Sequence, residues 1–224
     1  MREIVLDTET TGLDPAAGDR IVEIGAVELL NAIPTGRTFH AYVNPERAMA
    51  AAAEAVHGLG DAFLADKPVF AAIAEDLLAF LAEGRLVIHN AAFDLAFLNM
   101  EFGRLGHPPI GWDRVVDTLA IARRKHPGAA NSLDALCARY GIDNSRRTKH
   151  GALLDSEILA EVYLELSGGR QKALFAAPVA EDGAPREGRV TAHPARRRPE
   201  PLPSRLTDSE IAAHRAFVAT LGDE

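Results

Sequence analysis

The sequence predicts an α/β fold in which helices cover the faces of a mixed sheet. Residues 4–8, 21–29 and 38–43 have the β-branched and apolar composition of three successive strands, the last two forming a hairpin. From residue 69 to 167, helix-like segments alternate with short apolar strands. An antiparallel meander followed by such alternation is typical of a mixed sheet between layers of helices.

The turn of the hairpin can also be predicted. Residues 31–36 separate the second and third strands, and Pro34 and Gly36 lie in that segment. Both residue types favour turns, so we expect the chain to reverse direction there.

The remaining elements follow from the hydrophobic periodicity, which in helices is about 3.6 residues. We expect strands at 85–89 and 115–117, and helices at 69–82, 91–105, 119–124, 133–140 and 152–166. Asn90 precedes the second of these helices and is expected to cap it. Together these elements make a folded domain that we place at residues 1–167.

The chain changes character after this domain. Residues 168–206 include a long stretch rich in Ala, Pro, Arg, Glu and Gly without apolar periodicity, which predicts a flexible linker. Order should return in residues 207–224, where Thr207 and Glu210 have the spacing of a capping box. The apolar stripe of this terminal helix consists of Ile211, Phe217, Val218 and Leu221. A lone helix of this length is marginal in water, so we expect it to dock on a partner.

Composition argues against several classes of protein. The chain has 47% hydrophobic and 25% charged residues and no apolar run of about 20 residues, so we expect a soluble protein without a membrane span. Cys137, the single cysteine, is expected in the core, and the absence of a signal-peptide pattern predicts a cytoplasmic protein. The net charge of −8 argues against a general nucleic-acid coating protein, but not against an enzyme that grips a strand end through bound cations.

The sharpest local signal is the segment Asp7-Thr8-Glu9-Thr10-Thr11-Gly12 at the end of the first strand. Side chains two positions apart lie on one face of a strand, so the carboxylates of Asp7 and Glu9 should be neighbours. Such carboxylates repel each other unless a cation lies between them, and hard divalent ions such as Mg²⁺ or Mn²⁺ suit oxygen ligands best. A solvated strand end with two scattered acids is the alternative interpretation of these residues alone.

Two later segments add further acids and a histidine. Asp94 lies near the start of a strongly apolar helix, where it either complements the helix dipole or is buried and needs a partner. Asp155 lies within another helix, and His150 lies in the loop before it, next to the flexible Gly151. A lone histidine in such a loop is usually a surface residue, so its interpretation depends on the acids around it.

The order of these acids and His150 resembles that of a known family, the His-containing subclass of the DEDD exonucleases. Within this family the chain is most similar to the proofreading exonucleases of bacterial replicative DNA polymerases. The similarity spans residues 3–167, and the matching segments are residues 4–12, 24–28, 56–59, 87–94, 131–137 and 150–155. The resemblance implies a ribonuclease-H-like fold and a metal-dependent 3′→5′ exonuclease that releases 5′-mononucleotides.

The resemblance also implies a role for each site residue. The ligands of two ions, Mg²⁺ or Mn²⁺, would be Asp7, Glu9, Asp94 and Asp155. His150 would be the general base that takes a proton from the attacking water. The substrate-binding residues would be Asp7, Thr8, Glu9, His57 and Asp155.

One departure from the family and several neighbouring residues leave alternatives open. Family members often carry an acid, which contacts the terminal sugar, where this chain has Ala52; Glu54 is nearby but displaced. His89 is a rival general base, although its position directly before a helix favours a structural role. The basic segments 146–149 and 123–125 are either solvated or bind backbone phosphates.

The C-terminal part resembles the partner-binding regions of the same family. Gln171, Leu174 and Phe175 fit a short motif that binds a sliding clamp, and residues 207–224 resemble the segment that docks on the catalytic subunit of the polymerase. The linker would keep the exonuclease near a single-stranded or frayed 3′ end of DNA. A small third subunit is a further candidate partner. Two other functions stay open: trimming of RNA ends or free oligonucleotides, and a non-catalytic scaffold between polymerase and clamp, although no metal ligand of the pattern is lost.

Overall fold

The computed structural model describes residues 1–168 and 207–220 of the 224-residue chain. The chain divides into two units, residues 1–176 and 177–224. The first unit holds the α/β domain, and the described part of the second is a helix. The expected clamp motif at 171–175, with the rest of the expected linker, lies outside the described residues.

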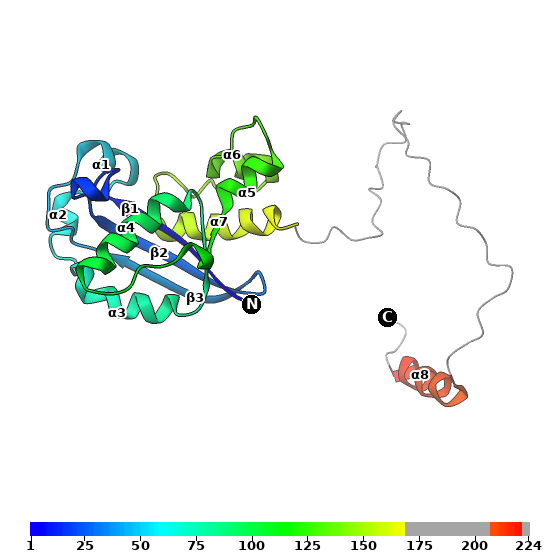
Figure 1. The fold of residues 1–224 in the computed structure, drawn as a ribbon. Coiled ribbons are helices and arrows are strands. Elements are labelled where there is room, and N and C mark those ends of the chain that lie inside the picture. The colour runs from blue at the N-terminus through cyan, green and yellow to red at the C-terminus, as the bar shows by residue number, and fades with distance from the viewer. Residues whose placement is uncertain (169–206, 221–224) are drawn as a thin grey trace. The chain divides into compact units, whose positions relative to one another are not determined.

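A five-stranded mixed sheet forms the centre of the domain (Figure 1). Its strands are β1 (Arg2–Thr10), β2 (Ile21–Leu30), β3 (Ile33–Tyr42), β4 (Arg85–Ile88) and β5 (Val115–Asp117). They lie in the order β3-β2-β1-β4-β5; β2 is antiparallel to β1 and β3, whereas β4 is parallel to β1 and β5. The mixed sheet predicted from the sequence is confirmed.

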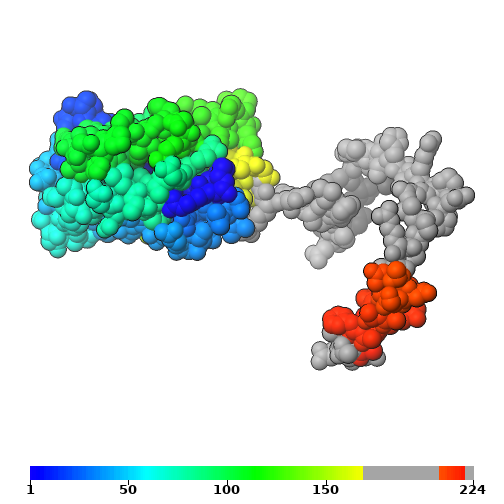
Figure 2. Space-filling view, turned by 60° about the horizontal axis from the view of Figure 1, so that its bottom comes forward, coloured from blue at the N-terminus to red at the C-terminus, as the bar shows by residue number. Residues whose placement is uncertain are grey.

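Helices cover both faces of this sheet. The helices of the domain are η1 (Pro15–Ala17), α1 (Ala51–His57), α2 (Asp61–Leu64), α3 (Phe70–Leu81), α4 (Ala91–Arg104), η2 (Trp112–Arg114), α5 (Thr118–Lys125), α6 (Leu133–Tyr140) and α7 (Ala152–Leu166). Helices α3 and α4 pack on one face, and their outer surfaces are seen side by side in Figure 2. Helix α7, backed by α5 and α6, packs on the other face.

The alternation of side chains along β1 assigns its residues to the two faces. Ile4 is fully buried in the core that α3 and α4 cover, whereas Val5 is fully buried under α7. By the same alternation, Asp7 and Glu9 belong to the α7 face of the sheet and Thr8 to the α4 face. Acids from either helix layer can therefore reach the end of this one strand.

Gly25 on β2 lets α7 approach the sheet closely. A Cβ atom at this position would lie 2.1 Å from the backbone nitrogen of Leu153, so no larger residue fits without moving the helix. The hydroxyl of Ser156 donates to the carbonyl oxygen of Gly25 over 2.9 Å. Because Gly25 pairs with Asp7 across the sheet, the first turn of α7, which carries Asp155, is held against the strand that carries Asp7.

The hairpin turn differs from the prediction. The reversal occurs at Asn31 and Ala32, whose φ angles are 53° and 63°, and Pro34 and Gly36 belong to β3. A two-residue turn with positive φ at both positions matches the right-handed twist of paired strands, so the strands continue further than the turn residues indicated.

The sequence prediction was also wrong about two features of the helices. Asn90 precedes α4, but its side chain makes no capping hydrogen bond, and its backbone is left-handed with φ of 66°. Helices α1 and α2 were not predicted. Helix α1 follows Ala50, which has no side chain that can cap, and most of its residues are exposed, so neither a cap nor an apolar stripe marks it.

The second unit contains α8 (Asp208–Thr220). The predicted capping box is confirmed, because the backbone N–H of Thr207 donates to Glu210 Oε2 over 2.7 Å and that of Glu210 donates to Thr207 Oγ1 over 3.4 Å. Within the predicted apolar stripe, Phe217 is 61% exposed, and Leu221 lies outside the described residues.

Cys137 is buried in the core that α5, α6 and α7 share, as the sequence predicted. Within residues 1–168 and 207–220, no helix has both the length and the apolar character that crossing a membrane requires.

Candidate active site

The acidic residues gather at one edge of the sheet. Strands β1, β4 and β5 run parallel, so their carboxyl ends meet at this edge. Asp7 and Glu9 lie near the end of β1, and the segment after β4 leads into α4, which carries Asp94. Helix α7 brings Asp155 to the same place from the opposite face. The structure therefore brings together the four acids that the sequence singled out.

Asp94 is buried and has a partner. Its side chain is 3% exposed, and its Oδ1 accepts hydrogen bonds from the backbone N–H of Thr8 (3.0 Å) and from the Thr8 hydroxyl (2.7 Å). These contacts join α4 to β1 beside the other acids. Of the two interpretations that the sequence left open, the buried acid with a partner is the one observed.

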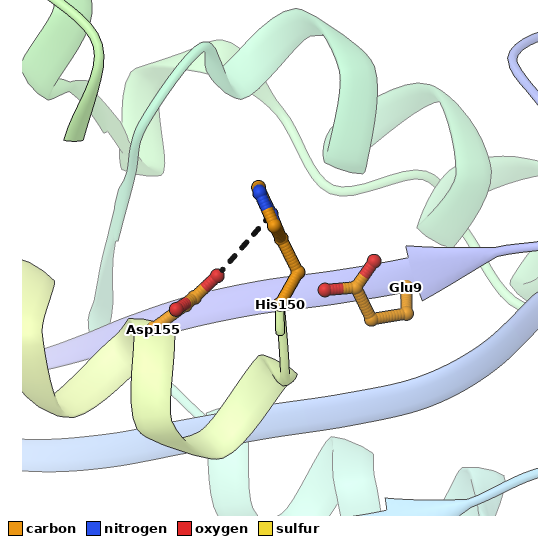
Figure 3. A group of neighbouring side chains, drawn as sticks. All are labelled: Glu9, His150 and Asp155. Carbon is orange, nitrogen blue, oxygen red and sulfur yellow. Dashed lines mark ion pairs between the residues drawn. The ribbon is translucent and has the colours of Figure 1, made fainter. Parts of the chain in front are cut away.

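Glu9, His150 and Asp155 form a tight group of potential ligands (Figure 3). One ligand atom from each residue lies within 4.8 Å of those from the other two. Glu9 and Asp155 are buried, whereas the His150 side chain is 48% exposed and belongs to the loop before α7. His150 Nδ1 lies 3.6 Å from Asp155 Oδ2. Asp7 and Asp94 lie outside this group.

Burial and mutual repulsion raise the pKa values of three acids. The pKa of Asp7 is well above its ordinary value, mainly because of burial and then because of the charges of Asp94, Glu9 and Asp155. Burial, followed by Asp155 and Glu23, raises the pKa of Glu9 to about 8. Burial also raises the pKa of Asp94 to about 7. Buried carboxyl groups that resist ionisation in this way favour the arrival of a cation.

Arg147 is the site residue that sequence reasoning missed, because it was assigned only to a basic segment that was solvated or bound phosphates. Its side chain is 8% exposed, and both Nε and Nη2 donate to the two oxygens of Asp155, the latter over 2.7 Å. Nη1 donates to Asp134 Oδ1 over 2.8 Å, and Nη2 lies 3.0 Å from His150 Nδ1. The hydrogen bonds to Asp155 raise the pKa of the guanidinium further above its ordinary value. No local pattern in the sequence marks this contact, because it depends on where the loop before α7 meets the helix.

Two hollows are lined in part by the acids, and a third lies next to one of them. One of about 340 Å³ has largely apolar walls, and its lining includes Thr8, Glu9, Leu13, Ala52, Val56, His57 and Phe93. Another of about 250 Å³ is lined by residues that include Asp7, Arg147, His150 and Asp155. A third, of about 480 Å³, shares His89 and Ser132 with the second and also includes Arg123.

His57 lies in the wall of the apolar hollow, where it is 6% exposed. Its Nδ1 accepts a hydrogen bond from the backbone N–H of Leu59 over 3.0 Å, and burial lowers the pKa of the imidazole. Ala52 also lines this hollow, but Glu54 does not; the Glu54 carboxylate packs against Gly60 instead. In this structure the Glu54 carboxylate therefore does not lie beside Ala52, where the missing acid would be.

His89 has hydrogen-bond partners at both ring nitrogens. Its Nδ1 lies 2.9 Å from the Thr118 hydroxyl, and its Nε2 lies 3.0 Å from the backbone oxygen of Asn131. This favours the structural role that its sequence position suggested. The predicted clamp residues Gln171, Leu174 and Phe175 lie outside the described part of the chain, so the structure does not place them.

Comparisons with known proteins agree with this geometry. Residues 4–163 match a family model described as Exonuclease. The DNA polymerase III subunit epsilon of Escherichia coli (strain K12) is 48% identical over 223 residues, which cover 96% of this chain and 91% of that protein. The chain belongs to the family of these epsilon subunits.

Other epsilon subunits and a solved exonuclease extend the comparison. The epsilon subunit of Rickettsia felis (strain ATCC VR-1525 / URRWXCal2) is 54% identical over 176 residues, 77% of each chain. A structure of exonuclease X in complex with 5′ overhanging duplex DNA is 28% identical, with a TM-score of 0.57, over 73% of this chain and 89% of that one. The ribonuclease-H-like fold is confirmed, and the activity is that of a proofreading 3′→5′ exonuclease from a metal-dependent family.

Proposed function

We propose that this epsilon-family exonuclease removes mispaired 3′-terminal nucleotides from DNA at the acidic edge of its sheet. The observation that carries the proposal is the convergence of Glu9, His150 and Asp155 within 4.8 Å, beside Asp7 and Asp94. Oxygen donors from buried acids with raised pKa values fit hard divalent cations, so Asp7, Glu9, Asp94 and Asp155 would hold two Mg²⁺ or Mn²⁺ ions. When bound, these ions would supply electrostatic stabilisation to the reacting phosphate and acidify a water molecule.

His150 would act as the general base. Its exposed imidazole lies next to Asp155 and can take a proton from the water that attacks the terminal phosphodiester. The bond between phosphorus and the 3′ oxygen of the preceding nucleotide then breaks, which releases a 5′-mononucleotide. His150 lies directly before Gly151, the residue at which the loop enters α7.

The hollow beside Thr8 and Glu9 would bind the terminal nucleoside. Its apolar walls, formed in part by Val56 and Phe93, suit a base that has left its stack. His57 is positioned at the same wall as a polar contact. A mispaired end costs less to separate from its template than a paired one, so the hollow would receive frayed ends preferentially.

The preceding nucleotides would follow the hollow lined by Asp7 and Arg147 and the neighbouring hollow that shares part of its lining. His89 and Ser132 belong to both hollows, and the exposed Arg123 lines the outer one. A guanidinium in the lining of this hollow is suited to a backbone phosphate, which the net negative charge of the chain would otherwise repel.

The partners follow from the family and the terminal segment. We propose that residues 207–224 dock on the catalytic alpha subunit of polymerase III and that Gln171, Leu174 and Phe175 bind a sliding clamp. The exposed Phe217 on α8 supports a docking helix, since an apolar side chain of this size gains free energy when a partner covers it. A linker at 168–206 would tether the exonuclease near the primer end, and a small third subunit would complete the assembly.

Competition between DNA and RNA ends tests this function. Purified protein with Mg²⁺ is given a primer–template with a 3′ mismatch, the matched duplex, and a structured RNA with the same sequence. We expect the mismatched DNA to be shortened most rapidly, with 5′-deoxymononucleotides as products. Preferential shortening of the RNA would instead establish an RNA-trimming enzyme, and complete inactivity with intact polymerase binding would establish a scaffold.

A further inference from the structure

The acid cluster contains a charged partner of its own. Among the lysine and arginine side chains of the described residues, Arg147 is the one that forms an ion pair with an acid of the cluster, namely Asp155. Its side chain is 8% exposed and its partner Asp155 is 3% exposed, so this pair is far better shielded from solvent than a surface salt bridge. The charge of the guanidinium also offsets a small part of the rise in the pKa values of Asp7 and Glu9, so its influence extends beyond Asp155.

The contact with Asp155 uses both carboxylate oxygens. Nε and Nη2 of Arg147 donate to Oδ1 and Oδ2 respectively, which is the two-pronged geometry that guanidinium and carboxylate groups prefer. A divalent ion on this carboxylate would lie beside the guanidinium, and the two positive charges would repel each other. Arg147 and a metal ion are therefore competitors for Asp155.

The same guanidinium engages the proposed general base. Nη2 lies 3.0 Å from His150 Nδ1, and because arginine can only donate, the ring nitrogen must offer its lone pair. An imidazole lone pair that accepts from Arg147 is not available at that nitrogen to take a proton from water. Both groups that the reaction needs free, Asp155 and His150, are thus held by one side chain.

The surroundings of Arg147 offer its guanidinium an alternative partner. The side chain lines the 250 Å³ hollow beside Asp7, where the reacting phosphate would lie. Guanidinium groups bind phosphate oxygens with the same two-pronged geometry as carboxylates. Its third partner, Asp134, is 59% exposed, so that contact is a weak anchor.

We propose that Arg147 is a displaceable internal cation that holds Asp155 and His150 until a substrate phosphate draws its guanidinium away. The proposal rests on the metal site proposed above. It makes metal loading and phosphate binding mutually dependent: each ligand removes an obstacle to the other, so each must strengthen the other's affinity by the same factor. Arg147 would be a positioning residue that acts through Asp155 and His150.

Calorimetric titration with Mn²⁺ alone tests the competition. We expect Arg147→Gln to bind Mn²⁺ about fivefold more tightly than the wild-type chain, because no guanidinium then competes with the ion for Asp155. Arg147→Lys keeps the positive charge but not the planar guanidinium that donates to both carboxylate oxygens. Its Mn²⁺ affinity should lie between those of the wild-type chain and Arg147→Gln. Arg146→Gln is the matched control: it removes the same charge one residue away, from a side chain that is 71% exposed, and should bind like wild type.

The coupling is measured by repeating each titration with thymidine 5′-monophosphate, which carries a phosphate but no bond to cleave. We expect this nucleotide to strengthen Mn²⁺ binding about fivefold in the wild-type chain and less than about twofold in Arg147→Gln. Thermal melts of each variant confirm that it is folded.

Three results would overturn the proposal: equal or weaker Mn²⁺ binding by Arg147→Gln, unchanged coupling in that variant, or Arg147→Lys indistinguishable from wild type. Each requires a wild-type chain that binds Mn²⁺. If the wild-type chain does not bind Mn²⁺ in a way that Asp7→Ala abolishes, the metal site itself is wrong, and the failure lies with the proposed function.

Discussion

The two halves of the active site are built differently. Asp7, Glu9 and Asp94 belong to regular elements at the edge of the sheet and are fixed by strand pairing or, for Asp94, by two hydrogen bonds from Thr8. The other half, with His150, lies on the loop between α6 and α7, and the imidazole is 48% exposed. The rigid half sets where charge accumulates, whereas the loop half can change its contacts when substrate arrives. Arg147 belongs to the loop half and reaches into the rigid one.

The largest effect should come from the rigid half. Asp7→Ala removes a proposed metal ligand, so we expect kcat on single-stranded DNA to fall by at least about 10³-fold. The fold should survive, because the loss of one repelling carboxylate relieves the cluster. Steady-state cleavage and a thermal melt measure the two effects, with the exposed Asp76→Ala as control. Activity near that of wild type would refute the role of Asp7.

Moving α7, and Asp155 with it, away from β1 should be nearly as damaging. Gly25→Ala places a Cβ atom into the backbone of α7, so the helix and Asp155 must shift away from β1. We expect kcat to fall by about 10²-fold and the free energy of unfolding by about 1–3 kcal/mol. The control is Gly103→Ala on α4, where a Cβ atom meets nothing within 4 Å. If Gly25→Ala keeps full activity, close packing of α7 is not what positions Asp155.

Most of the fold could be predicted from the sequence, and particular elements show why. The periodicity of α6 and α7 predicted Leu133–Tyr140 and Ala152–Leu166 with the observed bounds, since both helices bury one continuous apolar stripe. Helix α1 carries no such stripe and no side-chain cap, and the turn at Asn31 and Ala32 depends on strand twist rather than on turn-forming residues. Local patterns cannot predict features that only tertiary contact creates.

The candidate site divides in the same way. The acids could be predicted because their order along the chain, together with His150, resembles that of a known exonuclease family; taken alone, each acid left a structural alternative open. The ion pair between Arg147 and Asp155 could not be predicted, because it depends on where a loop meets a helix. That Ala52 lines the apolar hollow while Glu54 packs elsewhere likewise required the positions of α1 and its neighbours.

A smaller effect is expected outside both halves of the active site, along the proposed path of the DNA strand. Arg123→Gln should lower kcat/KM on a long oligonucleotide by about 3–10-fold. It should also reduce the salt dependence of binding by the contribution of about one phosphate contact. A dinucleoside monophosphate, whose only phosphate is the one cleaved, should be unaffected. Arg124→Gln, an exposed neighbour on the same helix, is the control. An equal loss on both substrates would place Arg123 at the reacting phosphate instead.

The smallest effect concerns stability and pH. The raised pKa values of Glu9 (about 8) and Asp94 (about 7) mean that the folded chain binds protons more tightly than the unfolded chain. Without divalent ions, stability should therefore be fully present below the ordinary carboxyl pKa and fall as pH rises towards about 8. Mg²⁺ should compensate, so its stabilising shift in melting temperature should be larger by about 4 °C at about pH 8.5 than at about pH 5.5. A shift that is equal at both pH values would contradict this.

The most direct test of the division between the halves is made on His150, which lies close enough to Glu9 and Asp155 to be either base or metal ligand. Mn²⁺ affinity and kcat are measured together for His150→Gln. We predict an Mn²⁺ affinity within about twofold of wild type and a kcat lower by about 10²–10⁴-fold, as expected for loss of a general base. Loss of Mn²⁺ binding together with activity would contradict it, because His150 would then belong to the metal site rather than act on water.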